Sequence, residues 1–436
     1  MTNSRKISRQ IGLVALVSAT YAMVAGGPFG LEEIIQTSGY RLGLLVICII
    51  TPLLWGLPTT LMVSELASAL PETGGFYVWT SRALGPFWGF QQSWLSFAGS
   101  IFDMAIYPIL FSTYLSRLVP MLGKGYTPFL VGVFMIVVCA AMNLRGTHFV
   151  GEGSIFLVLA LLVPFGILTW YGFSSHPVAT TSTHLTKPDV LAGILVAMWN
   201  YMGWDNASTI AGDVKNARRT YTLAMAIGLL LVIITYMIPI LAVAHAGIPA
   251  SDWETGAWVP LAGRLGGQKL ALLVTLAGML GALSTFNALV MALSRVPYAM
   301  ARKGFLPIMF GRENSYGAPW VSILVCSMFW ALATILGFEA TVMLDVLLTG
   351  LSILLEFVTL VALRIREPDL PRLFRVRGGL AGAIFVGIPP AILIAITCVR
   401  NHAERVGPFN ALTVGVSLVL LGVAFYFVGE RKRKLS

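Results

Sequence analysis

Carboxylates within apolar segments are the residues best suited to do chemistry in this chain. Asp103, Asp205 and Glu356 each lie in a long apolar stretch, and Glu32 and Glu33 directly follow the sequence "VAGGPFGL". An ionised carboxylate in hydrocarbon is costly, so such a residue normally faces the protein interior, is protonated or pairs with a cation. These five acids therefore predict the binding of a cation or of protons.

Aromatic side chains surround one of these acids in the sequence. Asp205 stands in "WNYMGWDN", where Trp199, Tyr201 and Trp204 precede it and Asn200 adds an amide. An ammonium group is bound well by a carboxylate together with aromatic ring faces, each worth about 0.5–2 kcal/mol. A second interpretation stays open, since Asp is also a favoured residue at the start of a helix and could cap one here.

The other acids differ in what surrounds them. Asp103 and Tyr107 are four residues apart, so a helix places them on one face. Glu356 lies among apolar residues in "SILLEFVTL", which favours a pocket role or a proton-carrying role. Glu32 and Glu33 point about 100° apart on a helix, so at most one of them faces a pathway. We expect Glu32, Glu33 or Glu356 to carry the coupling proton.

Four further acids receive structural interpretations. Glu65 and Glu72 flank the end of an apolar segment, where they would hold a gate or bind loop backbone. Glu152 and Asp345 are interpreted as lying near the ends of their segments, within reach of water or a basic neighbour. None of these four is expected to bind substrate.

The segments that position these residues are those of an integral membrane protein. The chain is 57% hydrophobic and 11% charged, with a mean hydropathy of +0.82. A span needs about 20 apolar residues, and the segments lack the alternation of a β-barrel, so we predict an all-α protein. Twelve spans are predicted, near residues 10–36, 42–69, 85–119, 127–143, 148–173, 189–213, 220–246, 269–300, 318–337, 340–363, 379–399 and 407–428.

Basic residues predict the orientation of these spans. With the N-terminus in the cytoplasm, most of the 29 Lys and Arg residues fall on the cytoplasmic side, and an even span count returns the C-terminus there. The net charge of +10 is then a topology signal with some anionic-lipid contact, so no nucleic-acid partner is expected. We expect a multi-pass protein of the plasma (inner) membrane.

Two of the twelve spans are interrupted by residues that helices avoid. The first contains Gly26, Gly27, Pro28 and Gly30, and the sixth contains the "NYMGWDN" sequence from Asn200. Paired interruptions five spans apart indicate a secondary transporter built from inverted repeats, whose unwound segments form the binding site. The repeats would cover about 10–173 and 189–363, followed by extra helices at about 379–428, all within one domain of residues 1–436.

Three stretches of the sequence carry a family resemblance. The sequences "GGPFGLEE", "PETGGFYVWTSRALGPFWGFQQSW" and "MWNYMGWDNASTIAGDVKNARRTY" resemble the amino acid–polyamine–organocation superfamily. The similarity is closest to its polyamine uptake transporters, in the branch of the L-type amino acid transporters, and "DMAIYP" and "LLEF" add to it. The resemblance implies a five-plus-five inverted repeat of the leucine-transporter type, and transport of amines or amino acids by alternating access, often with protons.

Two departures from the superfamily pattern bear on substrate and coupling. Amino acid transporters of the superfamily offer a backbone N–H to the substrate carboxylate where this chain has Pro28, which has none. Some proton-coupled members carry a lysine where this chain has Leu157. We therefore predict a proton-driven transporter of polyamines or related cationic amines, with an amino acid permease or exchanger as the alternative.

The predicted substrate site combines both interruptions with the intramembrane acids. No enzyme motif, ATP-binding loop, metal set or cofactor motif is recognisable in the sequence, so we expect neither catalysis nor a cofactor. The substrate-binding residues are expected to be Gly26, Gly27, Phe29, Gly30, Asp103, Tyr107, Trp199, Asn200, Tyr201, Trp204, Asp205 and Glu356.

Overall fold

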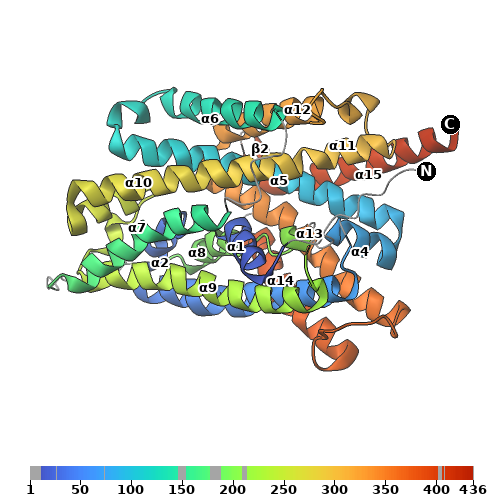
Figure 1. Cartoon of the computed structure of the whole chain (residues 1–436), viewed down its shortest axis with the longest axis horizontal. Coiled ribbons are helices and arrows are strands. Elements are labelled where there is room, and N and C mark those ends of the chain that lie inside the picture. The colour runs from blue at the N-terminus through green and yellow to red at the C-terminus, as the bar shows by residue number, and fades with distance from the viewer. Residues whose placement is uncertain are drawn as a thin grey trace.

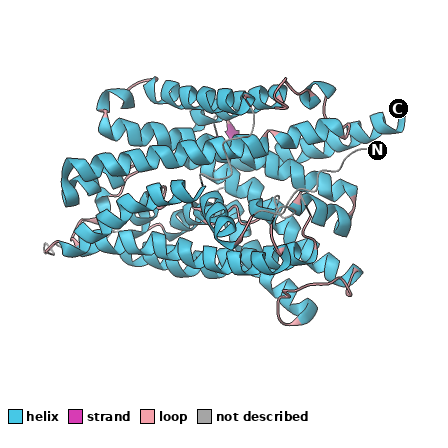
Figure 2. Cartoon of the chain, in the orientation of Figure 1, coloured by secondary structure: helices cyan, strands magenta, loops and turns pink. Residues whose placement is uncertain are grey.

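A computed structural model describes residues 11–25, 27–72, 74–145, 154–176, 188–208, 214–400, 405–406 and 408–435. The described chain is almost entirely helical, with one short antiparallel pairing of β1 (Arg405–Val406) and β2 (Phe409–Asn410) (Figure 2). This confirms the all-α class. Eight of the described helices are long and apolar enough to cross a membrane, and the shorter apolar helices are Leu13–Val24, Val158–Ser174 and Val190–Asn200.

The first half of the described chain folds into a run of helices that contains Asp103 and Tyr107. They are α1 (Leu13–Val24), α2 (Glu32–Leu45), α3 (Leu57–Ala69), α4 (Gly75–Leu84), α5 (Pro86–Leu118), α6 (Thr127–Leu144) and α7 (Ser154–Ser174). Between α2 and α3 the chain winds as π-helix over Val46–Ile50 and Pro52–Gly56. Pro52 explains this widening, because it lacks an N–H and its ring displaces the preceding turn.

The second half begins with a short helix that is followed by two long ones. Its helices are α8 (Val190–Asn200), α9 (Ala217–His245), α10 (Trp258–Leu293), α11 (Arg295–Arg302), α12 (Trp320–Ala333), α13 (Gly337–Arg366), α14 (Gly379–Arg400) and α15 (Ala411–Leu435). The long runs bend where glycine adopts a positive φ, at Gly39 (72°), Gly267 (74°) and Gly337 (79°). Such dihedrals are open to glycine and are not helical.

The helices lie roughly side by side, and two of the short ones, α1 and α8, are enclosed. Figure 1 places α1, α8 and α13 between α10 on one side and α9 on the other. α13 packs most extensively against α5, which also packs along α10. The outer helices α6, α14 and α15 present large apolar side chains outward, such as Phe134, Phe385 and Leu420, as helices facing lipid do.

Candidate functional site

The two predicted interruptions adjoin in space. α1 ends at Val24 and α2 begins at Glu32, while α8 ends at Asn200. The Asn200 side-chain amide donates to the Gly30 carbonyl at 3.4 Å. Gly203, with φ of +94°, lies so close to the first break that an added Cβ would be 2.7 Å from the Met23 carbonyl oxygen. The two unwound segments therefore lie in contact with each other. Only glycine fits at position 203, where they meet.

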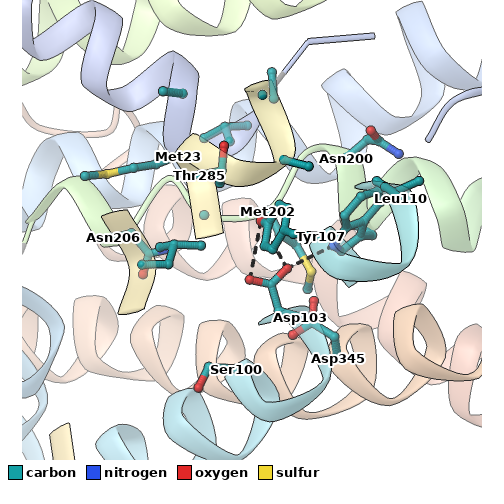
Figure 3. Close-up of a pocket in the computed structure, with 18 of the residues that line it drawn as sticks. Met23, Ser100, Asp103, Tyr107, Leu110, Asn200, Met202, Asn206, Thr285 and Asp345 are labelled. Carbon is teal, nitrogen blue, oxygen red and sulfur yellow. Dashed lines mark hydrogen bonds between the residues drawn. The ribbon is translucent and has the colours of Figure 1, made fainter. Parts of the chain in front are cut away.

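A cavity of about 80 Å³ lies beside these breaks. The end of α1, the segment after α8, and α5, α10 and α13 contribute its walls, and Figure 3 shows Asp103 and Asp345 next to each other there. Asp103, Asp205 and Asp345 all line the cavity, and none of the described lining residues is Lys, Arg or His. In a low-dielectric surrounding this arrangement favours a cation.

Asp103 is held by two aromatic donors. Trp199 Nε1 donates to Asp103 Oδ1 at 3.1 Å, and Tyr107 Oη lies 3.4 and 3.5 Å from its two carboxylate oxygens. All three residues line the cavity, and their predicted role in binding substrate stays a prediction. Pro108, the residue after Tyr107, lies inside α5. It has no N–H to close the helical turn, so a backbone carbonyl of that turn is left free.

The position of Asp345 differs from the sequence interpretation, which was wrong here. It was expected near the end of a span, but it lies more than two turns inside α13, is 3% exposed and lines the cavity. Thr349 donates its hydroxyl to Asp345 Oδ1 at 2.7 Å. Gly99 of α5 makes room for this pair, since a Cβ there would lie 3.3 Å from Asp345 Oδ1 and closer still to Thr349.

Asp205 lines the cavity, although its aromatic neighbours in sequence mostly do not. Its Oδ1 is buried and has no hydrogen-bond partner among the described residues. Tyr201 turns away and donates to the Ile47 carbonyl at 2.9 Å, while the Trp204 ring packs toward Gly228. Tyr201 and Trp204 therefore do not reach the cavity, which corrects the expected aromatic cage; of the three rings, only Trp199 does.

The glycines of the first break shape the site without lining it. Gly27 and Gly30 have φ of +96° and +84°, and both are absent from the cavity wall. Gly26 lies outside the described residues. Phe29 lines the cavity, and its ring centroid is 4.8 Å from that of Tyr114 and 5.0 Å from that of Phe165. The break therefore serves to bring an aromatic side chain against the cavity.

Glu32 and Glu33 occupy the first turn of α2, where the sequence placed them. Glu32 is fully buried and accepts hydrogen bonds from the Gly30 N–H, at 2.7 Å, and from the Tyr114 hydroxyl. Glu33 accepts one from the Thr255 hydroxyl. Neither acid lines the cavity, so in this arrangement Glu32 fixes the break and Glu33 binds the segment before α10.

Glu356 and Glu65 are buried acids that do not line the cavity. Glu356 is fully buried but outside the cavity wall, and it accepts a hydrogen bond from Gln92 Nε2 at 2.7 Å. Glu65 accepts from Arg364 Nε at 2.8 Å and from the Val376 N–H at 2.7 Å. Glu65 thus binds loop backbone as well as two arginines, since Arg372 Nε also lies 3.4 Å from Glu65 Oε1.

Glu72 is exposed after α3, whereas Glu152 lies outside the described residues. Leu157 falls within α7, the helix in which some superfamily members carry lysine.

Several cavity residues were absent from the sequence prediction. They are chiefly Ser96, Ser100, Tyr114, Thr285, Asp345 and Thr349. The spacing of Asp345 and Thr349, one helical turn apart and followed by Ser352 and Glu356, was a readable signal of one polar helix face. Thr285 of α10 was less readable, because Ser284 and Asn287 beside it are polar without carrying a charge.

Comparisons with known proteins agree with this architecture. A family model for amino acid permeases matches residues 16–428. Polyamine transporter PUT1 of Oryza sativa is 33% identical over 98% of this chain and 80% of its own length, and polyamine transporter RMV1 of Arabidopsis thaliana is 31% identical over 94% and 84%. The serine/threonine exchanger SteT of Bacillus subtilis is 26% identical over 60% and 62%. The chain therefore belongs to the amino acid permease family of the amino acid–polyamine–organocation superfamily, and it is a multi-pass membrane transporter rather than an enzyme.

Proposed function

We propose that this protein transports polyamines or related cationic amines, driven by protons, through alternating access. The observation that carries the proposal is the cavity with Asp103, Asp205 and Asp345 on its walls and no described basic side chain among them. Each ammonium group of a diamine needs a negative partner in a medium where unpaired charge is costly. The names of two relatives, both polyamine transporters, support the same substrate class.

The first break argues against an α-amino acid as the main substrate. Such a substrate needs free backbone N–H groups for its carboxylate, as unwound half-helices often provide. Pro28 has no N–H, and the N–H of Gly30 already donates to Glu32 at 2.7 Å. An approaching carboxylate would also meet the three aspartates.

The alternative is an amino acid permease or exchanger. The serine/threonine exchange named for one relative favours it, and Asn200 beside the first break supplies a polar group that suits a zwitterion. Under this alternative Gly27 and Gly30 would bind the carboxylate, and carbonyls of the segment after α8 would bind the amine.

The fold supports a proposed division into twelve spans. Gly39 and Gly337 split two of the long helical runs, and the two interrupted helices each open a set of five spans, as an inverted repeat of the leucine-transporter type requires. The repeats would be residues 10–173 and 189–363. The breaks would then let one half rock against the other around the cavity.

The orientation is also a proposal, and charge supports it. Figure 1 shows α4, α11 and the end of α15 at one end of the molecule. Arg82, Arg302 and Arg431 belong to these segments. The positive-inside rule makes that end cytoplasmic, in the plasma (inner) membrane, with anionic lipid nearby.

Counterflow in proteoliposomes tests the substrate. Vesicles loaded with unlabelled putrescine or spermidine should accumulate labelled spermidine, and vesicles loaded with serine or threonine should not. Trans-stimulation by neutral amino acids alone would establish the alternative instead. Empty vesicles of the same lipid provide the background.

A further inference from the structure

A second buried polar site lies at the α5–α13 interface, beyond the cavity. Gln92 donates Nε2 to Glu356 Oε1 at 2.7 Å, and both side chains are fully buried. Glu356 Oε2, Gln92 Oε1 and Ser352 Oγ are nevertheless without a hydrogen-bond partner among the described residues. A buried polar atom left unpaired costs free energy, about 1–3 kcal/mol each. Three such atoms at one site indicate that the site binds a further group besides these side chains.

A polar face of α13 joins this site to the cavity. Asp345, Thr349, Ser352 and Glu356 follow at intervals of three or four residues, so they lie along one helix face. Asp345 and Thr349 line the cavity, and Glu356 lies about 10 Å farther along the axis than Thr349. Beyond it, Thr359 donates to Thr80 of α4 at 3.1 Å.

α5 faces this stripe with small and polar residues. Gly99 lies against Asp345 and Thr349, and Gln92, two turns earlier in α5, meets Glu356. The hydroxyl of Ser96, between them in sequence, belongs to a cavity-lining residue. The interface therefore places hydroxyl and amide side chains at intervals of about one helical turn between the cavity and Glu356, which suits a route for protons.

The charges around Glu356 favour a proton as the occupant. Asp205, from the segment after α8, is within electrostatic range of Glu356, and Asp345 and Asp103 stand farther along the two helices. Arg364 lies two turns beyond Glu356 but is bound to Glu65 and to the loop before α14. No described cation pairs with Glu356, so its negative charge finds only acids nearby and a proton neutralises it best.

We propose that Glu356, held by Gln92, is the proton site that couples amine transport, and that the polar face of α13 connects it to the cavity. This rests on the proposed function. The substrate's ammonium groups occupy the cavity aspartates, while the proton occupies a carboxylate that the substrate does not contact. On release, the O–H bond of Glu356 breaks and the proton passes to a water oxygen. Glu32, with two donors already bound to it, is left to hold the break.

Glu356→Gln separates coupling from binding. The amide keeps the shape and fixes the group in an uncharged state. In proteoliposomes at symmetrical pH, this variant should retain spermidine counterflow within about twofold of the wild type, since exchange needs no net proton movement. An imposed pH gradient should no longer drive accumulation, and an entrapped pH-sensitive dye should show no spermidine-dependent proton movement. Proton-driven accumulation by Glu356→Gln would overturn the proposal.

Gln91→Leu is the matched control. Gln91 precedes Gln92 and is also buried, but its side chain lies against Gly422 of α15 instead of α13. This variant should keep proton-driven accumulation. If it loses coupling as Glu356→Gln does, the effect is not specific to the proposed site and the proposal fails.

Two outcomes in the wild type separate this inference from the proposed function. Amine counterflow without any response to a pH gradient would leave the function intact and overturn the proton site. Absence of amine counterflow would overturn both.

If Glu356→Gln does not fold, Gln92→Met replaces it: the pH at half-maximal driven uptake should shift by about half a unit or more, because the group bound to Glu356 has changed. An unchanged pH profile would contradict the proposal.

Discussion

The ring of Trp199 packs directly over Gly30, so that a Cβ on Gly30 would lie 2.7 Å from Trp199 Cζ3. This contact joins the second interruption to the first, and Trp199 continues from it to donate to Asp103. One side chain thus connects a helix break to a carboxylate of the cavity.

Gly30→Ala should therefore abolish transport. The substitution adds a clash with Trp199 and forces alanine into φ of +84°, a conformation that costs about 1–2 kcal/mol for an L-residue. Initial rates of labelled spermidine uptake provide the measurement. Gly12→Ala is the matched control, because Gly12 has φ of −87° and nothing within 4 Å of an added Cβ. Normal uptake by Gly30→Ala would contradict this role of the contact.

Asp345→Asn should weaken amine binding by about 10–100-fold, since a hydrogen bond to a charged group is worth about 1.5–3 kcal/mol. Asp103→Asn should have a comparable effect, while uptake still saturates at high substrate. KM for spermidine is the quantity to compare. Asp369→Asn, on an exposed aspartate outside the cavity, should leave KM unchanged. If Asp345→Asn behaves like Asp369→Asn, Asp345 does not bind substrate.

The buried pair of Glu65 and Arg364 should show strong coupling in stability. Both side chains are 1% exposed, so removing Arg364 leaves the buried Glu65 with only the longer contact to Arg372, at 3.4 Å, and costs a part of the about 3–5 kcal/mol of a fully broken buried pair. Arg364→Met should therefore lower Tm in detergent markedly. The double variant Glu65→Met/Arg364→Met should recover part of that loss, because Arg372 is then the one charge of the three that remains, and its guanidinium still donates to backbone carbonyls. Additive losses in the double variant would show that the two charges are not coupled.

The ion pair between Arg82 of α4 and Glu367 at the end of α13 should make the stability of the fold depend slightly on pH. A hydrogen bond from Arg82 lowers the pKa of Glu367, so the pair stabilises the fold above the ordinary carboxyl pKa and loses this contribution as the pH falls through the lowered value. The side chains are 40% and 30% exposed, which limits the contribution to about 1 kcal/mol or less. Arg82→Gln should lower Tm relative to the wild type at neutral pH. This difference in Tm should become smaller at acidic pH. A constant difference at every pH would exclude this pair as the cause.

Cysteine labelling tests the proposed orientation. In a variant without the four native cysteines, Arg375→Cys places an exposed thiol in the segment between α13 and α14. It should resist an impermeant maleimide in intact cells and react in inside-out vesicles, because the basic end is proposed to be cytoplasmic. Lys124→Cys, in the segment between α5 and α6, should show the opposite pattern. Reversed labelling of the two positions would invert the orientation.

The sequence predicted the breaks better than it predicted the cavity. Glycine and proline in an apolar segment disrupt a helix locally, so the interruptions at Gly30 and after Asn200 could be recognised without tertiary information. Asp103, Tyr107 and Trp199 were expected at the site because acids and aromatics are unusual in spans, and the structure does bring them together.

The errors have a common physical cause. The position of Asp345 depends on where α13 begins and on its pairing with α5, where Gly99 makes room for it; neither is a local property of the sequence. Tyr201 and Trp204 are next to Asp205 in sequence, but the backbone after α8 turns their side chains toward Ile47 and Gly228. Local composition indicated the residue types of the site, whereas helix packing decided which side chains reach it.

Direct binding of labelled spermidine to the purified protein tests the central claim, that an acidic cavity selects cationic amines. Unlabelled putrescine should displace the label and serine should not, and the double variant Asp103→Asn/Asp345→Asn should lose the displaceable signal while remaining folded. Displacement by serine, or undiminished binding to the double variant, would contradict the account.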